Sequence, residues 1–249
     1  MKASFLTAAI LMLGMALLPA ANAAELKVLA GGSIAGPLNE LKAQFEQTSG
    51  HKLTIHFDST PNLIKLATSD APFDLGVVPI DVFKDAAAKA KFAGPTIDIA
   101  RVGYGVAVRA GAAKPDISSP EALKQTLSKA QSIATLPASA AGAYVLSVFE
   151  RLGIGEAMKA KIKVQPTPAA IPQAVAKGEA EVGVFLTNVL IAPGVELAGS
   201  FPAELQQELI FTAAIALASK EADAAKAFIT YLKTPAAIAV IKAKGMNPG

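Results

Sequence analysis

The chain has 249 residues, no cysteine, and 23 basic against 20 acidic side chains, for a formal net charge of +3. This near balance excludes the dense basic face that nucleic-acid binding needs. The absence of cysteine excludes a disulfide framework, a thiolate metal site and a lipid-modified cysteine. The length allows one large domain or two lobes.

The first 23 residues have the pattern of a cleavable export signal. Lys2 precedes an apolar run over residues 5–18, and the segment closes on Ala21, Asn22 and Ala23. The run is short for a membrane span of ~20 residues. We therefore expect cleavage after Ala23 and, without a lipid anchor, a periplasmic protein. Secretion to the medium is the alternative.

Short β-rich runs alternate with amphipathic helical stretches in the first part of the mature chain. Residues 26–30 predict a strand, 31–33 a turn, and a helix follows from Pro37. A second strand over 53–57 leads to a helix start at 59–61, where hydroxyl residues precede proline. A strand over 73–78 and a helix reaching about Lys91 come next. This alternation predicts an α/β fold with a mainly parallel sheet covered by helices.

The middle of the chain opens with a long β-prone run over residues 96–108, which is long enough to pass from one lobe to another. Three further strands are predicted, over residues 132–136, 181–186 and 212–218. One helix is predicted to begin at Ser119 and another after the loop 138–142. The last three predicted helices cover residues 171–177, 222–233 and 236–244. No flexible linker interrupts this order. A boundary between lobes therefore has to lie in crossing strands.

Three loops share one property that bears on binding. Residues 31–33, 59–60 and 139–142 each follow a predicted strand and open a helix. Ligands of open α/β sheets bind at the carboxyl ends of the strands, and the free N–H groups of helix N-termini hold anions without lysine or arginine. The pattern predicts an anion site, although simple helix capping also explains each serine.

Five segments in this order resemble the molybdate-binding branch of the periplasmic solute-binding superfamily: AGGSIAGPLNELKAQFEQTSG, HFDSTPNL, AAGAYVLSVFERLGI, AVAKGEAEVGVF and AKAFITYLKTPAAIAVI. The resemblance covers essentially the whole mature chain. It implies a two-lobed type II periplasmic-binding-protein fold, with two crossing strands as a hinge and the ligand in the cleft between the lobes. After the signal peptide 1–23, we expect lobe 1 to contain residues 24–104 and 206–249, and lobe 2 residues 105–205.

The resemblance also implies the function. The chain is expected to be a monomer that binds a small ligand such as molybdate or tungstate and hands it to an inner-membrane ABC permease, with no catalytic residue, cofactor or metal. Ser33 and Ser59 fall where that family places its ligand-binding serines, and Ala141 falls where an alanine gives a backbone N–H. With their loop neighbours, the candidate ligand-binding residues are Gly32, Ser33, Ser59, Thr60 and Ala141.

Three residues depart from the family pattern. Pro168 replaces a valine that donates its backbone N–H, and proline has none. Leu186 stands where the family has a ligand-binding tyrosine, with Thr187 or Asn188 as substitutes, and Asp58 puts a carboxylate beside Ser59. A carboxylate repels a dianion unless it turns away as a helix cap. An unidentified anion or a small organic solute therefore stays open beside molybdate.

Other functions are less well supported by the residues. A serine hydrolase at Ser33 lacks the G-x-S-x-G register, and its possible bases, His51 and His56, do not follow in the usual order. A metal site at His51, His56 and Asp58 would draw on both faces of one strand. The ligand-sensing domain of a transcription regulator needs a DNA-binding segment where this chain has its signal peptide.

Overall fold

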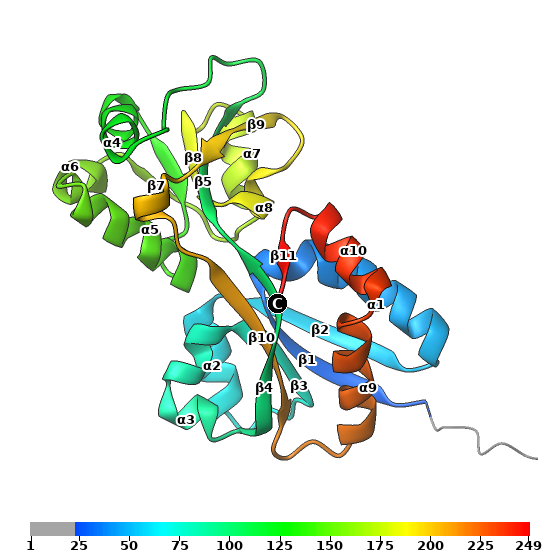
Figure 1. Cartoon of the computed structure of the whole chain (residues 1–249). Helices are drawn as coiled ribbons and strands as arrows, with labels where there is room; N and C mark the ends of the chain where they lie inside the picture. Colours follow the sequence, from blue (N-terminus) through cyan, green and yellow to red (C-terminus); the bar gives the residue numbers. More distant parts are fainter. Residues whose placement is uncertain (1–22) are drawn as a thin grey trace, which may run out of the picture.

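The structure is a computed structural model that describes residues 23–249, so the predicted signal peptide lies, except for Ala23, outside the described residues (Figure 1). The chain forms two sheets, each with helices packed on it, in the two-lobed α/β arrangement that was expected. The strand order is β11-β4-β10-β3-β1-β2 in one sheet and β7-β6-β8-β5-β9 in the other.

The first lobe is built from both ends of the described chain. Its elements are β1 (Glu25–Gly31), η1 (Gly32–Ile34), α1 (Ala35–Ser49), β2 (Lys52–Asp58), α2 (Thr60–Thr68), β3 (Leu75–Pro79), η2 (Ile80–Lys84), α3 (Ala86–Lys89), β4 (Phe92–Val102), β10 (Leu209–Ala216), α9 (Ala222–Leu232), α10 (Pro235–Ala243) and β11 (Asn247–Pro248). Strands β1, β2 and β3 are parallel, whereas β10 runs antiparallel between β3 and β4.

The second lobe contains the middle of the chain. Its elements are β5 (Tyr104–Arg109), α4 (Pro120–Lys129), β6 (Ile133–Thr135), α5 (Ala140–Arg151), α6 (Gly155–Lys159), β7 (Ile162–Val164), α7 (Ala170–Ala176), β8 (Val182–Leu186), α8 (Thr187–Leu190), β9 (Val195–Ser200) and η3 (Ala203–Leu205). Strands β6, β7 and β8 are parallel and β5 is antiparallel to β8 and β9. Both sheets are therefore mixed, because the crossing strands return against the parallel set.

The two segments that cross between the lobes lie side by side. The long β-prone run divides at Gly103, which separates β4 from β5, and a Cβ at this position would lie 3.0 Å from the Gln206 side chain. The Gln206 amide accepts from the Tyr104 N–H at 2.8 Å and donates to the Tyr104 carbonyl at 3.0 Å. This side chain ties one crossing segment to the other between the β4–β10 and β5–β9 pairings.

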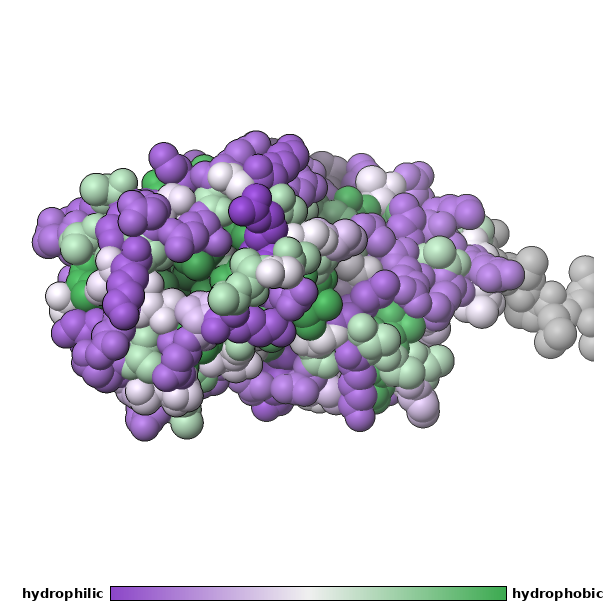
Figure 2. Space-filling view, turned by 90° about the horizontal axis from the view of Figure 1, so that it is seen from above, coloured by the Kyte–Doolittle hydropathy of each residue, from purple (hydrophilic) through white to green (hydrophobic). Residues whose placement is uncertain are grey.

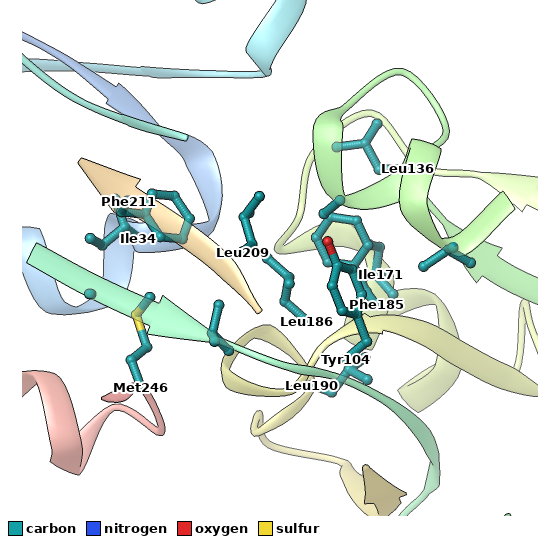
Figure 3. Packing of buried hydrophobic residues seen from close by; sticks show 14 of the residues in the cluster. Ile34, Tyr104, Leu136, Ile171, Phe185, Leu186, Leu190, Leu209, Phe211 and Met246 are labelled. Atoms are coloured by element: carbon teal, nitrogen blue, oxygen red, sulfur yellow. The ribbon is translucent and has the colours of Figure 1, made fainter. Parts of the chain in front are cut away.

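Large apolar side chains fill the region where the lobes join (Figure 3). Tyr104 is 1% exposed, and Leu186 and Leu209 are buried beside it in the same cluster. The Tyr144 ring lies 4.7 Å from that of Tyr104, and its hydroxyl donates to the Leu205 carbonyl at 2.8 Å. Burial raises the pKa of Tyr104 far above its ordinary value, so its phenol stays neutral.

The C-terminal helices α9 and α10 pack on α1, which places the end of the chain in the lobe that contains its beginning (Figure 1). The rings of Phe45 and Phe228 lie 4.9 Å apart. Thr234 accepts from the Ala237 N–H at 3.3 Å and so caps α10. No single helix within residues 23–249 is long and apolar enough to cross a membrane; α9 and α10 pass that test only together, bent by 63°.

Two local predictions were incomplete. The helix expected up to about Lys91 is two short pieces, η2 and α3, because the Asp85 side chain starts a new cap by accepting from the Ala88 N–H at 2.8 Å. The edge strands β7 and β9 were not predicted, because β7 has only three residues and β9 is half-buried, so neither has a clear apolar run. On the molecular face in Figure 2, polar residues cover most of the surface and apolar areas are small.

Candidate functional site

All five predicted ligand-binding residues line one narrow cleft between the lobes. The first lobe contributes Gly31, Gly32, Ser33, Asp58, Ser59, Thr60, Pro79, Leu209 and Phe211; the second contributes Leu136, Ser139, Ala140, Ala141 and Pro168. Its free volume is about 20 Å³, little more than the space of one water molecule. The lobes are therefore nearly closed on each other.

The first lobe offers unused hydroxyl groups at two strand ends. Ser33 follows β1 and Ser59 follows β2, and these parallel neighbours pair Gly31 with Asp58. Neither hydroxyl caps its helix, and neither forms a hydrogen bond within residues 23–249. A hydroxyl that caps a helix already accepts a hydrogen bond from a backbone N–H of that helix. These two hydroxyls are thus free to donate to a ligand in the cleft.

The second lobe offers backbone groups instead. The Ser139 hydroxyl accepts from the Gly142 N–H at 2.9 Å and donates to the Leu136 carbonyl at 2.8 Å, so it is fully used as the cap of α5. This cap leaves the N–H of Ala141 in the first turn without an intrahelical acceptor. Across the cleft, the Ala140 N–H lies 3.4 Å from the Thr60 hydroxyl, which is a direct polar contact between the lobes.

Asp58 is the charged residue of the cleft, and its carboxylate is turned toward the start of α2. It accepts from the Ser59 N–H at 2.7 Å and from the Asn62 amide at 2.9 Å, and the His56 ring lies 3.4 Å away. Partial burial by itself raises the pKa of Asp58, but these hydrogen bonds outweigh burial and hold the pKa below its ordinary value. Asp58 is therefore a charged residue whose carboxylate is held at the start of α2 by these hydrogen bonds.

The positions that depart from the family pattern have different roles here. Pro168 reaches the cleft without an N–H, and its ring would lie 3.3 Å from a Cβ at Gly32. Leu186 is fully buried in the joining region and does not line the cleft. Thr187 lies 3.3 Å from the Gly103 carbonyl. No lysine or arginine from residues 23–249 lines the cleft.

Asn188 contacts the site in a way that the sequence pattern did not indicate. Its amide nitrogen donates to the Ser33 carbonyl at 2.8 Å, 155 residues away in sequence and in the other lobe. The only sequence signal was its position two residues after Leu186, where a polar residue was a possible substitute for the missing tyrosine. The contact ties the second lobe to the loop that carries Ser33.

The arrangement gives little support to hydrolytic or metal chemistry. The Ser33 hydroxyl has no histidine partner among residues 23–249. His51 accepts from the Ala24 N–H at 3.1 Å and stacks on Phe45, whereas His56 pairs with Asp58 at the other end of β2. Within the described part of the chain, no group of three or more His, Asp or Glu side chains is arranged to hold a metal ion.

Comparison with known proteins agrees with this arrangement. The chain is 32% identical to a Pseudomonas protein named aconitate isomerase, over 96% of this chain and 94% of that protein. It is 31% identical to the molybdate-binding protein ModA of Azotobacter vinelandii, over 91% of each. The solved periplasmic molybdate-binding protein of that organism superimposes with a TM-score of 0.73 at 22% identity, over 89% of this chain and 98% of that one.

A family profile extends the match along nearly all of the described chain. Residues 26–247 match the bacterial extracellular solute-binding proteins. The two lobes, the crossing strands and the cleft described above are the features expected of such a protein. The chain belongs to the family of bacterial extracellular solute-binding proteins.

Proposed function

We propose that this chain is an exported, periplasmic protein that captures a small anion between its lobes, delivers it to an ABC permease and catalyses no reaction. The observation that carries the proposal is the convergence of unused donors from both lobes on one cleft. The donors are the hydroxyls of Ser33 and Ser59 and the N–H of Ala141, in a cleft without lysine or arginine.

Neutral donors suit reversible capture of an anion. Hydrogen bonds to a charged group contribute roughly 1.5–3 kcal/mol each after exchange with water, and a buried charge needs several of them because its burial without partners is costly. Without a paired cation, release does not require breaking an ion pair. This combination favours a protein that binds and releases its ligand unchanged.

The ligand class is supported by the relatives and limited by the site. The ModA relative is named for molybdate, so molybdate and tungstate are candidates here. Pro168 and Leu186 remove two expected donors, and the Asp58 charge lies beside Ser59. Each change weakens binding of a bare dianion, and another anion or a small organic solute remains a candidate.

A second candidate is an isomerase that acts on aconitate, because the Pseudomonas relative carries that name and the cleft contains one carboxylate, Asp58. Proton transfer along a carbon skeleton needs a general base. Asp58 is a weak choice, because its hydrogen bonds keep its pKa low and therefore reduce its basicity. We therefore place ligand capture first.

One experiment tests both candidates on the purified mature protein. Thermal unfolding is measured with molybdate, tungstate, sulfate, phosphate and small carboxylates, and aconitate solutions are followed for isomerisation. A ligand at 100 times its Kd should add about 2.7 kcal/mol of stability. Stabilisation without turnover supports capture. Turnover of aconitate, or no stabilisation by any anion, would overturn the proposal.

A further inference from the structure

The fixed charge of the proposed anion cleft is negative. Among residues 23–249, Asp58 is the one acidic or basic residue that lines it, and the Asp58 side chain is 29% exposed. The His56 ring lies 3.4 Å from the Asp58 carboxylate and is charged only when protonated. Lys244 lines an adjoining space instead, and its Nζ lies 3.0 Å from the Glu40 carboxylate, which offsets its charge. At pH 8, where histidine is neutral, no cation of the cleft balances Asp58.

Local hydrogen bonds keep the Asp58 carboxylate ionised. Its Oδ1 accepts from the Ser59 N–H at 2.7 Å and from the Asn62 amide at 2.9 Å. Burial by itself raises the pKa of Asp58, but these hydrogen bonds hold the pKa below its ordinary value. The negative charge is therefore present at neutral pH and above.

The Asp58 carboxylate also occupies a donor that a ligand would otherwise use. The Ser59 N–H is bonded to Asp58, so Ser59 offers a ligand its hydroxyl alone. Pro168 has no N–H, and the Ala140 N–H lies 3.4 Å from the Thr60 hydroxyl. Burial of a charge is costly without several hydrogen-bond partners, and a double charge needs more of them. The donors that remain suit a single charge.

The carboxylate is close enough to the binding hydroxyls to act on a ligand without contact. Asp58 Oδ1 lies 2.7 Å from Ser59 N, so covalent geometry places any ligand oxygen bonded to the Ser59 hydroxyl within about 9 Å of it. Salt at physiological concentration screens such a pair only in part. With an effective dielectric of about 20–40, the repulsion lowers affinity about five- to twentyfold for each unit of ligand charge.

Building on the proposed function, we infer that the ligand is a singly charged anion, either a monovalent oxyanion or a monocarboxylate, and that Asp58 is the specificity-determining residue that discriminates against dianions. Ser33, Ser59 and Ala141 supply donors for one charge. A dianion of the same shape meets the Asp58 repulsion twice and finds no additional donor to offset it.

Calorimetric titration at pH 8 with pairs of anions that differ by one charge tests this inference. Perrhenate and tungstate are tetrahedral oxyanions of similar size with one and two charges, and butyrate and succinate form a pair of similar length. We expect the singly charged member of at least one pair to bind at least as tightly as its partner. Asp58→Asn should shift the affinity ratio of that pair toward the dianion about five- to twentyfold.

Asp58→Asn keeps a side-chain oxygen that can accept from the Ser59 N–H, so it removes the charge and preserves the local hydrogen bond. Asp58→Ser is a second neutral variant with an acceptor at the same place. Asp116→Asn is the matched control, because Asp116 Oδ1 accepts from the Ser118 N–H at 2.9 Å in a similar local contact but does not line the cleft. This control should leave the ratio unchanged.

The ratio separates charge selection from a structural role of Asp58. Damage to the loop at Ser59 weakens both members of a pair alike and does not favour the dianion. A ratio that neither neutral variant shifts toward the dianion overturns the inference, as does a natural protein that prefers the dianion of both pairs by more than tenfold. Either result leaves anion capture standing. Binding of none of the four compounds, or of molybdate, sulfate and phosphate, counts against anion capture itself.

Discussion

Four serines illustrate how residues of one type, in similar local patterns, have different roles. Ser119 and Ser139 accept from the N–H three residues ahead, at 3.2 and 2.9 Å, and so cap their helices. Ser59 occupies the N-cap position of α2 and Ser33 lies within η1, and neither makes such a bond. A hydroxyl that already forms a hydrogen bond with its own helix is not available to bind a ligand. The two free hydroxyls are therefore the ones expected to contribute to binding.

Replacing Ser33 or Ser59 by alanine should weaken ligand binding about ten- to a hundredfold, because one hydrogen bond to a charged ligand is lost. Stability should change little, since neither hydroxyl caps a helix. Calorimetric titration with the compound identified by thermal shift measures the first effect, and urea unfolding measures the second.

Ser119→Ala is the matched control for these variants. It removes a true cap far along the chain in α4, so it should cost about 1 kcal/mol of stability and leave affinity unchanged. Unchanged affinity in both Ser33→Ala and Ser59→Ala would show that the proposed site is wrong.

The charge of Asp58 predicts a pH dependence of stability. Its pKa in the folded chain lies below the ordinary value of 3.8, so its contribution is present above pH 3.8 and is lost as the pH falls through the folded pKa. Asp58→Asn should therefore be less stable than the natural protein at pH 7, with a difference that shrinks below pH 3.8. Urea unfolding at both pH values measures it, and an equal difference at both would contradict the assignment.

At the scale of an element, the turn between β6 and α5 determines where Ala141 lies. A Cβ on Gly142 would come within 1.7 Å of the Leu136 carbonyl oxygen, so the turn can close this tightly only with glycine. The Ser139 cap uses the same carbonyl. Backbone packing and capping together hold the first turn of α5 against the cleft.

Gly142→Ala should lower stability by about 1–3 kcal/mol, because the turn must shift to relieve the overlap, and it should also weaken ligand binding by displacing Ala141. Gly36→Ala is the matched control in α1. No atom lies within 4 Å of its added Cβ, so it should be neutral or gain up to about 1 kcal/mol. Urea unfolding compares them, and equal stability of the two variants would refute this role for Gly142.

At the scale of the whole molecule, the two lobes touch at separate points on the cleft. The Ala140 N–H meets the Thr60 hydroxyl, and Asn188 meets the Ser33 carbonyl. The crossing segments that join the lobes are held together by Gln206 and Tyr104. The arrangement is therefore a closed one, with few polar contacts to break on opening.

Binding between two domains commonly uses hinge closure, so ligand should make the protein more compact. Small-angle scattering of the mature protein should give a larger radius of gyration without ligand than with saturating amounts of the compound found by thermal shift. Scattering curves that coincide in the two conditions would contradict hinge closure.

The sequence by itself determined the alternation of strands and helices and most helix starts, because these depend on residues close together in the chain. Ser119 illustrates this, since a hydroxyl before proline is a local capping signal. The three loops at strand ends were predictable for the same reason. The half-exposed strands β7 and β9 were not, because their pairing depends on neighbours far along the chain.

Only the tertiary structure decided which groups of those loops are free and what faces them. Asp58 turns to Asn62 and His56, Pro168 packs over Gly32, and Asn188 reaches the Ser33 carbonyl. Each of these depends on contacts across the cleft or on the choice among several local hydrogen-bond partners. Such choices are settled by packing over the whole molecule, whereas helix starts and strand runs are settled within a few residues.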